Sequence, residues 1–274
     1  NLENPVSDFR FCGLQHRDEY FSKDDSISID EFPWLAVILN ATLPEQKQRI
    51  CGGTLITKTY VLTSAQCMFQ FNIDDRILVR LADYHIKNST DCAKLKRVSG
   101  YNCDNIEEYE IKKEIIHPFY NKYTLYNDIA LLKLNKEIDY SDFIRPICLP
   151  RSEKDLASHG DILFSTGFGF NTRYGDQLKK KILASLISNE VCKVRFNTLT
   201  FVNPVIPYQI CTEDIKNSSD VACVGDEGGP VMHSKRLRWF IEGISSTYGC
   251  EDNVPQTSLS VYKYLKWIKL NIEE

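Results

Sequence analysis

Short apolar segments separated by turns run through most of this 274-residue chain and constrain its fold more than any other feature. From residue 50 onward the segments are rich in valine, isoleucine, leucine and threonine, and their lengths suit single β-strands. Helical periodicity is scarce over the same region. The pattern therefore predicts an all-β protein, and clear examples of its strands are residues 53–56, 60–63, 76–81 and 129–134.

The last part of the chain departs from this pattern. Over residues 260–270, Val261, Leu265 and Ile268 recur at helical spacing, whereas the lysines between them fall on another face. We expect a C-terminal helix that packs on the body and turns its lysines to solvent. A chain of this length can bury a large core, either as one domain of two packed halves or as two domains.

The composition excludes several classes of function. A net charge of −4 and a pI of about 5.8 give no indication of nucleic-acid binding. The basic run at residues 179–181 is short and is interpreted as a solvated loop. No segment approaches the roughly 18 apolar residues of a membrane span. The chain starts at Asn1 without a charged and apolar leader, so we expect that any secretion signal has been removed.

Ten cysteines, widely spaced and even in number, indicate an oxidised, secreted protein. They form no Cys-x-x-Cys pair, so neither a zinc site nor any other metal or cofactor is predicted. Three Asn-x-Ser/Thr sequons fit the same compartment and permit glycosylation at Asn40, Asn88 and Asn217.

The octet at residues 223–230, Cys-Val-Gly-Asp-Glu-Gly-Gly-Pro, resembles the Gly-Asp-Ser-Gly-Gly-Pro signature of trypsin-like serine proteases. In that signature the serine hydroxyl attacks a carbonyl, and the glycines let the backbone turn so that two N–H groups face the developing oxyanion. Here Glu227 stands at the serine position. The resemblance leaves the N–H groups of Gly225 and Glu227 as the remnant of an oxyanion hole.

Residues 50–56 and 62–67 resemble the family motifs Cys-Gly-Gly-x-Leu-Ile and Leu-Thr-Ala-Ala-His-Cys, with Gln66 in place of the histidine. The general base must be an imidazole, because only that group titrates near neutral pH, and a carboxamide cannot exchange the proton. Residues 127–132 match Asn-Asp-Ile-Ala-Leu-Leu and retain Asp128. We expect Asp128 to hydrogen-bond backbone N–H groups and Gln66. A relocated base is not expected from the five histidines, which are His16, His85, His117, His159 and His233.

The resemblance also implies a degenerate specificity pocket. Val221 lies six residues before Glu227, where a trypsin carries the carboxylate that receives arginine or lysine. Thr247, in the run Ser-Ser-Thr at 245–247, and Gln256, after Pro255, stand at wall positions that need small residues. We expect both side chains to narrow the pocket.

Sequence alone does not determine the disulfide connectivity. The family pattern implies Cys51–Cys67, Cys192–Cys211 and Cys223–Cys250, and arthropod clip-domain proteases suggest Cys12–Cys148 and Cys92–Cys103. Residues 1–20 would then be a tether linked to the body by one disulfide, and 21–274 a trypsin-like double six-stranded β-barrel with a C-terminal helix. The family's activation cleavage would fall near Tyr20–Phe21, which lack the expected chemistry. The resemblance spans residues 12–270 and includes no six-cysteine clip module.

The lost nucleophile and base together predict a secreted, catalytically inactive serine protease homologue. By resemblance, it would act as a cofactor or regulator of an extracellular immune cascade, such as prophenoloxidase activation and melanisation. Its partners would be other secreted proteins: proteases, zymogens or inhibitors of haemolymph or a venom-like fluid. One alternative is a decoy or competitive blocker of such a cascade. Another is a hydrolase that uses Asp128 and Glu227 as a carboxylate pair.

The side chain of Glu227 has two expected positions. In the family fold it would lie beside the oxyanion hole, where the carboxylate could accept the N–H groups, and this is the position we favour. The alternative is that it faces Asp128, where two like charges would raise one pKa or recruit a cation.

Overall fold

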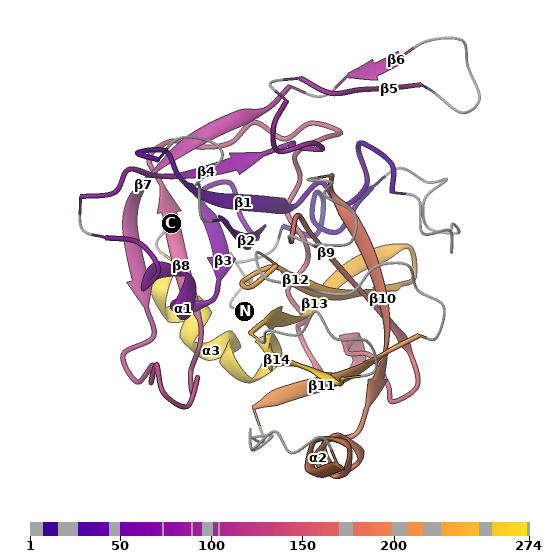
Figure 1. The fold of residues 1–274 in the computed structure, drawn as a ribbon. Coiled ribbons are helices and arrows are strands. Elements are labelled where there is room, and N and C mark those ends of the chain that lie inside the picture. Colours follow the sequence, from indigo (N-terminus) through magenta and orange to yellow (C-terminus); the bar gives the residue numbers. More distant parts are fainter. Residues whose placement is uncertain are drawn as a thin grey trace, which may run out of the picture.

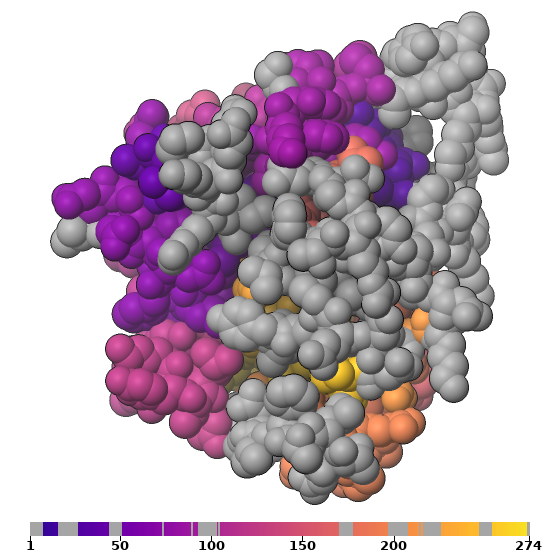
Figure 2. Space-filling view, viewed as in Figure 1, coloured from indigo at the N-terminus to yellow at the C-terminus, as the bar shows by residue number. Residues whose placement is uncertain are grey.

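The computed structural model describes residues 8–15, 27–43, 50–72, 74–88, 90–94, 101–103, 105–169, 178–198, 208–215, 226–246 and 254–272. Within these residues the chain forms two closed antiparallel barrels of six strands each and a helix near the C-terminus (Figure 1). The first barrel occupies the upper left of the view and the second the lower right, and Figure 2 shows the same face with its atoms filled in. This architecture confirms the predicted all-β double barrel.

The first barrel is built from the strands that the apolar segments predicted. Residues 60–63 coincide with β3, and β4 and β8 each begin one residue later than expected. The side chains of β1 are all buried, because one face lines the barrel and the other is covered by the rest of the molecule. The strand order is β1 (Leu35–Asn40), β2 (Ile50–Leu55), β3 (Tyr60–Thr63), β8 (Ala130–Leu134), β7 (Glu107–Ile116), β4 (Ile77–Leu81).

The second barrel is formed by the C-terminal half of the chain. Its order is β10 (Lys180–Ile187), β11 (Gln209–Asp214), β14 (Gln256–Ser260), β13 (Arg238–Ser245), β12 (Pro230–Lys235), β9 (Ile162–Gly167). A separate hairpin of β5 (Cys92–Lys94) and β6 (Tyr101–Cys103) projects at the top of Figure 1. The helices are α1 (Ala65–Met68), the short 3-10 helix η3 (Glu153–Asp155), α2 (Asn189–Thr198) and α3 (Val261–Asn271).

Helix α3 has the predicted orientation. Val261, Leu265 and Ile268 are buried in the main core, whereas Lys266 and Lys269 are exposed. Its Tyr264 hydroxyl donates to the Asn127 side chain at 2.9 Å, next to the start of β8. No helix in the described ranges is long and apolar enough to cross a membrane.

Aromatic side chains join the two barrels. The ring of Trp239 on β13 meets Phe32 and Phe164 edge-on, with ring centroids 5.1 and 5.0 Å apart. Trp34 is fully buried beside them. Such edge-to-face pairs add to the free energy of burying the rings, so this cluster fixes the entry segment before β1 against the second barrel.

The three lysines at residues 179–181 are buried, so the interpretation of this run as a solvated loop is wrong. The Lys181 ammonium pairs with the Glu31 carboxylate at 3.1 Å, and Lys179 donates to the Ile29 and Glu31 carbonyls at 2.8 Å each. Lys180 donates to the Gly169 carbonyl at 2.8 Å. Burial is tolerated because each ammonium exchanges water for a carbonyl or carboxylate oxygen.

Four of the expected disulfides are present, and Cys223–Cys250 lies outside the described residues. The bonds are Cys12–Cys148, Cys51–Cys67, Cys92–Cys103 and Cys192–Cys211. The first attaches residues 8–15 to the second barrel, where Gly13 accepts a hydrogen bond from the Trp239 N–H at 3.0 Å. Gly13 has φ +65°, and a Cβ there would lie 2.4 Å from the Trp239 oxygen, so no other residue fits this docking.

Candidate functional site

The structure brings the three expected triad positions together at the junction of the barrels. Gln66 lies on α1, which follows β3 and is fastened to β2 by the Cys51–Cys67 bond. Its backbone N–H donates to Asp128 Oδ1 at 2.7 Å, and its side-chain Nε2 donates to the Ser246 carbonyl at 3.0 Å. Asp128 therefore binds a backbone N–H group as expected. The side-chain amide of Gln66, in contrast, donates to the Ser246 carbonyl.

Burial dominates the electrostatics of Asp128. The side chain is fully buried, and loss of water raises the pKa of its carboxyl to about 7. The backbone N–H groups of Gln66 and Ala65 act in the opposite direction, while the negative charge of Glu227 raises the pKa further. Asp128 therefore changes its charge near neutral pH, unlike an ordinary aspartate.

Glu227 is buried in the turn that leads into β12, with 2 % of its surface exposed. Its carbonyl accepts the Gly52 N–H at 2.7 Å, which ties the turn to the first barrel. The next residue, Gly228, has φ +81°, and a Cβ there would lie 2.3 Å from Thr63 Oγ1. The Gly228 N–H donates to the Ser245 carbonyl at 2.8 Å, so both barrels hold the turn.

The buried Glu227 carboxyl is not directed to solvent, and its charge acts on Asp128. A raised pKa at one of the two carboxyl groups is what the second expected position, with Glu227 facing Asp128, implies. Gly225, the other member of the expected oxyanion-hole remnant, lies outside the described residues.

Asp226, beside Glu227, occupies a cradle that only glycine can line. Its Oδ1 accepts the Gly169 N–H at 2.6 Å. A Cβ on Gly167 or Gly169 would lie 2.1 or 2.2 Å from an Asp226 carboxylate oxygen. The same Gly169 offers its carbonyl to Lys180, so the backbone of one glycine links a buried carboxylate to a buried ammonium. The expected activation segment near Tyr20 lies outside the described residues.

Two of the histidines within the described ranges have surroundings of their own, apart from Asp128. His117 packs against the rings of Tyr264 and Trp267, with centroids 5.6 and 5.2 Å away. His233 Nδ1 lies 2.9 Å from the Glu242 carboxylate inside the second barrel. Across the same ranges, no group of three or more His, Cys, Asp or Glu side chains is arranged to hold a metal ion.

One of the three expected pocket residues is described. Gln256 begins β14 opposite Thr212 and is 8 % exposed, which fits a side chain that fills a wall. Val221 and Thr247 lie outside the described residues. Of the sequons, Asn88 is exposed, whereas Asn40 is buried and accepts the Thr42 N–H at 2.9 Å; Asn217 is not described.

Sequence reasoning missed two partners of the site. The Ser246 carbonyl receives the Gln66 amide, although the only sequence signal was the place of Ser246 in the expected pocket wall. The Gly169 backbone donates its N–H to Asp226 and accepts Lys180 at its carbonyl, and the repeated glycines at 167 and 169 were the signal available.

Comparison with known proteins agrees with the fold. Residues 23–268 match the model of the trypsin family. The chain is 32 % identical to CLIP domain-containing serine protease B10 of Anopheles gambiae, with 95 % of this chain and 72 % of the relative covered. It is 31 % identical to phenoloxidase-activating factor 1 of Holotrichia diomphalia over the same shares. Against CLIP domain-containing serine protease B9 of Anopheles gambiae it spans 61 % of the relative's length at 32 % identity.

A solved structure gives the same result. The Drosophila Grass clip serine protease of the Toll pathway superimposes with a TM-score of 0.76 and 25 % identity, covering 97 % of this chain and 76 % of the other. The similarity therefore extends over both barrels and the helix between Val261 and Asn271.

Proposed function

This chain belongs to the trypsin family of serine proteases, and we propose that it is a catalytically inactive member that binds other proteins and regulates a proteolytic cascade. One observation carries the proposal: Gln66 and Glu227, which stand at the general-base and nucleophile positions of the motifs that the sequence resembles, lie around a buried Asp128. In a measured triad, loss of the nucleophile or the base alone costs on the order of 10⁶ in turnover. Either replacement would end useful proteolysis.

The chemistry of the two side chains supports this view. The Gln66 amide donates its hydrogen to the Ser246 carbonyl and cannot take up a proton near neutral pH. Glu227 has no hydroxyl with which to form an acyl-enzyme. The turn geometry at Gly228 is kept while the reacting groups are absent, as expected of a chain that uses the fold for binding.

A hydrolase that uses Asp128 and Glu227 has less support. The two carboxyl groups are electrostatically coupled, which acid–base chemistry would require. They are also 0 % and 2 % exposed, so a substrate would have to displace packed protein to reach them.

The names of the relatives support the proposed cascade and compartment. Three of them are named phenoloxidase-activating factor 1, phenoloxidase-activating enzyme and melanization protease 1. The disulfides suit an oxidising compartment. We therefore place this chain in an extracellular fluid such as haemolymph, with proteases, zymogens or inhibitors of prophenoloxidase activation as its partners.

Two assays on the recombinant chain test the proposal. Serine-directed phosphonates should leave the chain unlabelled, and peptide and ester substrates should stay intact. Labelling of one cleft residue in every molecule would refute inactivity. In a reconstituted prophenoloxidase activation, a cofactor should raise the yield of active phenoloxidase relative to an equal amount of reduced, unfolded chain. A lower yield would identify the chain as a blocker, and an unchanged yield would remove this cascade from consideration.

A further inference from the structure

A cavity of about 500 Å³ opens on the second barrel, away from the triad positions. It lies between the N-terminal segment, the region around η3 and the β12–β13 hairpin. Strand β12 starts just after the Glu227 turn and runs six residues to the hairpin, so the hairpin tip lies about 20 Å from that turn. We call this cavity the basic pocket; its principal lining residues are Phe9, Arg151, Lys154, Lys235, Arg236 and Arg238.

The charge of the basic pocket is opposite to that of the whole chain. Among the described residues that line it, five side chains are cationic and one, Asp155, is a carboxylate, while the complete chain carries a net charge of −4. The Asp155 carboxylate accepts the Arg151 backbone N–H at 2.9 Å and lies 3.9 Å from Arg151 Nε. A concave surface with this excess of cations concentrates positive potential and attracts anions.

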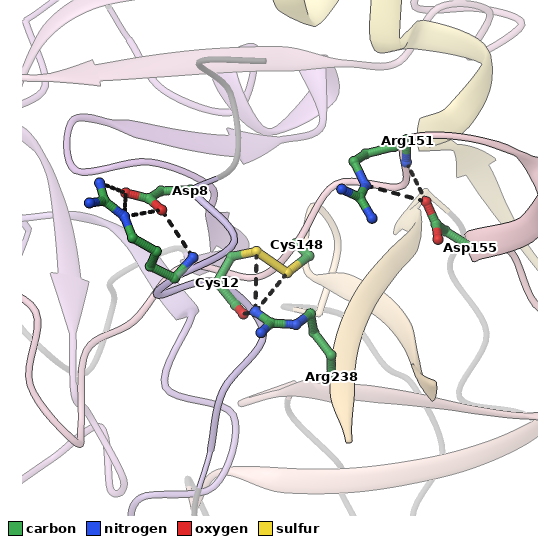
Figure 3. The surroundings of a disulfide bond; sticks show 7 residues. Asp8, Cys12, Cys148, Arg151, Asp155 and Arg238 are labelled. Atoms are coloured by element: carbon green, nitrogen blue, oxygen red, sulfur yellow. Dashed lines mark hydrogen bonds and ion pairs between the residues drawn. A yellow bond between two sulfur atoms is a disulfide. The ribbon is translucent and has the colours of Figure 1, made fainter. Parts of the chain in front are cut away.

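Two of the cations are fixed by the protein itself. Arg238 donates to the Cys12 carbonyl at 2.5 Å and reaches toward the sulfur atoms of the Cys12–Cys148 bond (Figure 3). Lys235 donates to the Lys154 and Leu156 carbonyls at 2.7 and 3.1 Å. These bonds hold the hairpin against the other two segments and build the wall of the pocket.

The other three cations, Arg151, Lys154 and Arg236, are exposed to solvent. The Arg151 guanidinium lies over the Phe9 ring, with its Cζ 3.8 Å from the ring centroid, and the side chain is 55 % exposed. Lys154 and Arg236 are exposed, and in the described part of the chain neither side chain has an ion-pair partner. A guanidinium held by an aromatic face is oriented in advance for a planar carboxylate.

The hairpin backbone supports a binding role. Arg236 and Leu237 have φ of +54° and +59°, values that a two-residue hairpin turn normally meets with glycine or asparagine. Leu237 is also 47 % exposed. The hairpin tip thus carries an arginine and a leucine in a backbone conformation that favours glycine or asparagine. Backbone strain of this kind clusters at ligand-binding sites.

We propose that the basic pocket binds an acidic peptide segment of a partner protein through its aspartate or glutamate carboxylates. The cavity is within the range that peptide-sized ligands fill and is larger than a bare phosphate or sulfate needs. Its five cations come from two segments, residues 151–154 and 235–238, and lie beside the rings of Phe9 and Phe240, which suits carboxylates interspersed with apolar side chains. The proposal holds whether or not the chain is catalytically active.

The test uses the full chain and a fluorescein-labelled peptide of alternating glutamate and leucine, measured by fluorescence anisotropy. The same peptide with glutamine in place of glutamate is the control ligand. Saturable binding is expected for the acidic peptide alone, and it should weaken as salt is raised. Absence of saturable binding, or equal binding of the glutamine peptide, would overturn the proposal.

A pair of charge reversals locates the site. Lys154→Glu with Arg236→Glu should weaken peptide binding by at least about tenfold, since like charges would then face each other. Lys266→Glu with Lys269→Glu on α3 makes the same change of net charge on another exposed surface and should leave binding unchanged. Equal effects of the two pairs would refute the assignment to this pocket.

Two further ligands test whether the pocket prefers another kind of anion to the carboxylates of a peptide. A sulfated oligosaccharide and inorganic sulfate are offered in competition with the peptide. If either binds more tightly than the peptide, and the Lys154 and Arg236 reversals abolish that binding, the pocket is an anion site for a different ligand and the peptide proposal fails. Thermal unfolding of each variant confirms that it is folded, so that loss of binding reports on the pocket.

Discussion

Replacement of Asp128 by asparagine should stabilise this protein at alkaline pH, the opposite of what loss of a buried hydrogen-bonded group usually does. Asparagine has nearly the same shape, and its Oδ1 can still accept the Gln66 N–H that now lies 2.7 Å from the carboxylate. It also removes the negative charge that the buried site disfavours and that faces the charge of Glu227.

The magnitude follows from the pKa of the Asp128 carboxyl, which burial raises from 3.8 to about 7. Between these values the folded protein holds a proton that the unfolded chain has released, so the free energy of unfolding falls as pH rises from 4 to 7. A difference of about three pKa units corresponds to about 4 kcal/mol. The stability of Asp128→Asn relative to the unsubstituted protein should therefore rise by about 4 kcal/mol between pH 4 and pH 8.

Urea unfolding followed by tryptophan fluorescence at pH 4, 6 and 8 measures this difference. Comparing the two proteins at each pH cancels the contribution of the other titrating groups. Glu137→Gln, at a carboxylate that is 73 % exposed, is the matched control and should show little dependence on pH. A stability difference for Asp128→Asn that is constant across this range would refute the reasoning.

Three further changes test other parts of the structure. Lys181→Met should lower the free energy of unfolding by about 3–5 kcal/mol, because it leaves the buried Glu31 carboxylate without its cation. Adding Glu31→Leu should restore most of that stability, and denaturant titrations measure both changes. Gln66→His with Glu227→Ser should leave cleavage of arginyl substrates at background, because the expected specificity pocket offers basic side chains no carboxylate; trypsin-like rates would contradict this. Asn88 is exposed and should carry glycan, which glycosidase treatment and mass spectrometry of secreted protein can establish.

The strands could be predicted because their signal is local. Residues 60–63, Tyr-Val-Leu-Thr, form a short run suited to a single strand, and the structure forms β3 over that span. Closure into two barrels did not follow from periodicity and came from the resemblance carried by the motifs around Gln66, Asp128 and Glu227. Those motifs also identified the altered positions, because each motif specifies which residue type to expect at each of its positions.

What could not be predicted depends on partners distant in sequence. The oxygen atoms around Lys179 and Lys181 belong to residues 29–31, about 150 positions earlier, so the basic run gave no sign of its burial. The amide of Gln66 reaches a carbonyl 180 positions later. The basic pocket likewise assembles from residues 9, 151–155 and 235–240, which lie far apart along the chain, so the run Lys-Arg-Leu-Arg at 235–238 did not by itself indicate a cavity.

The Cys12–Cys148 bond keeps the two products of a single proteolytic cut covalently linked. It closes a loop of 136 positions, so a single cut anywhere between the two cysteines yields two polypeptides that migrate together until a reductant is added. Phe9, three residues before the bond, remains at high effective concentration beside Arg151 and Arg238 after such a cut. A nicked two-chain form would therefore keep the wall of the basic pocket, and a thiol would release it.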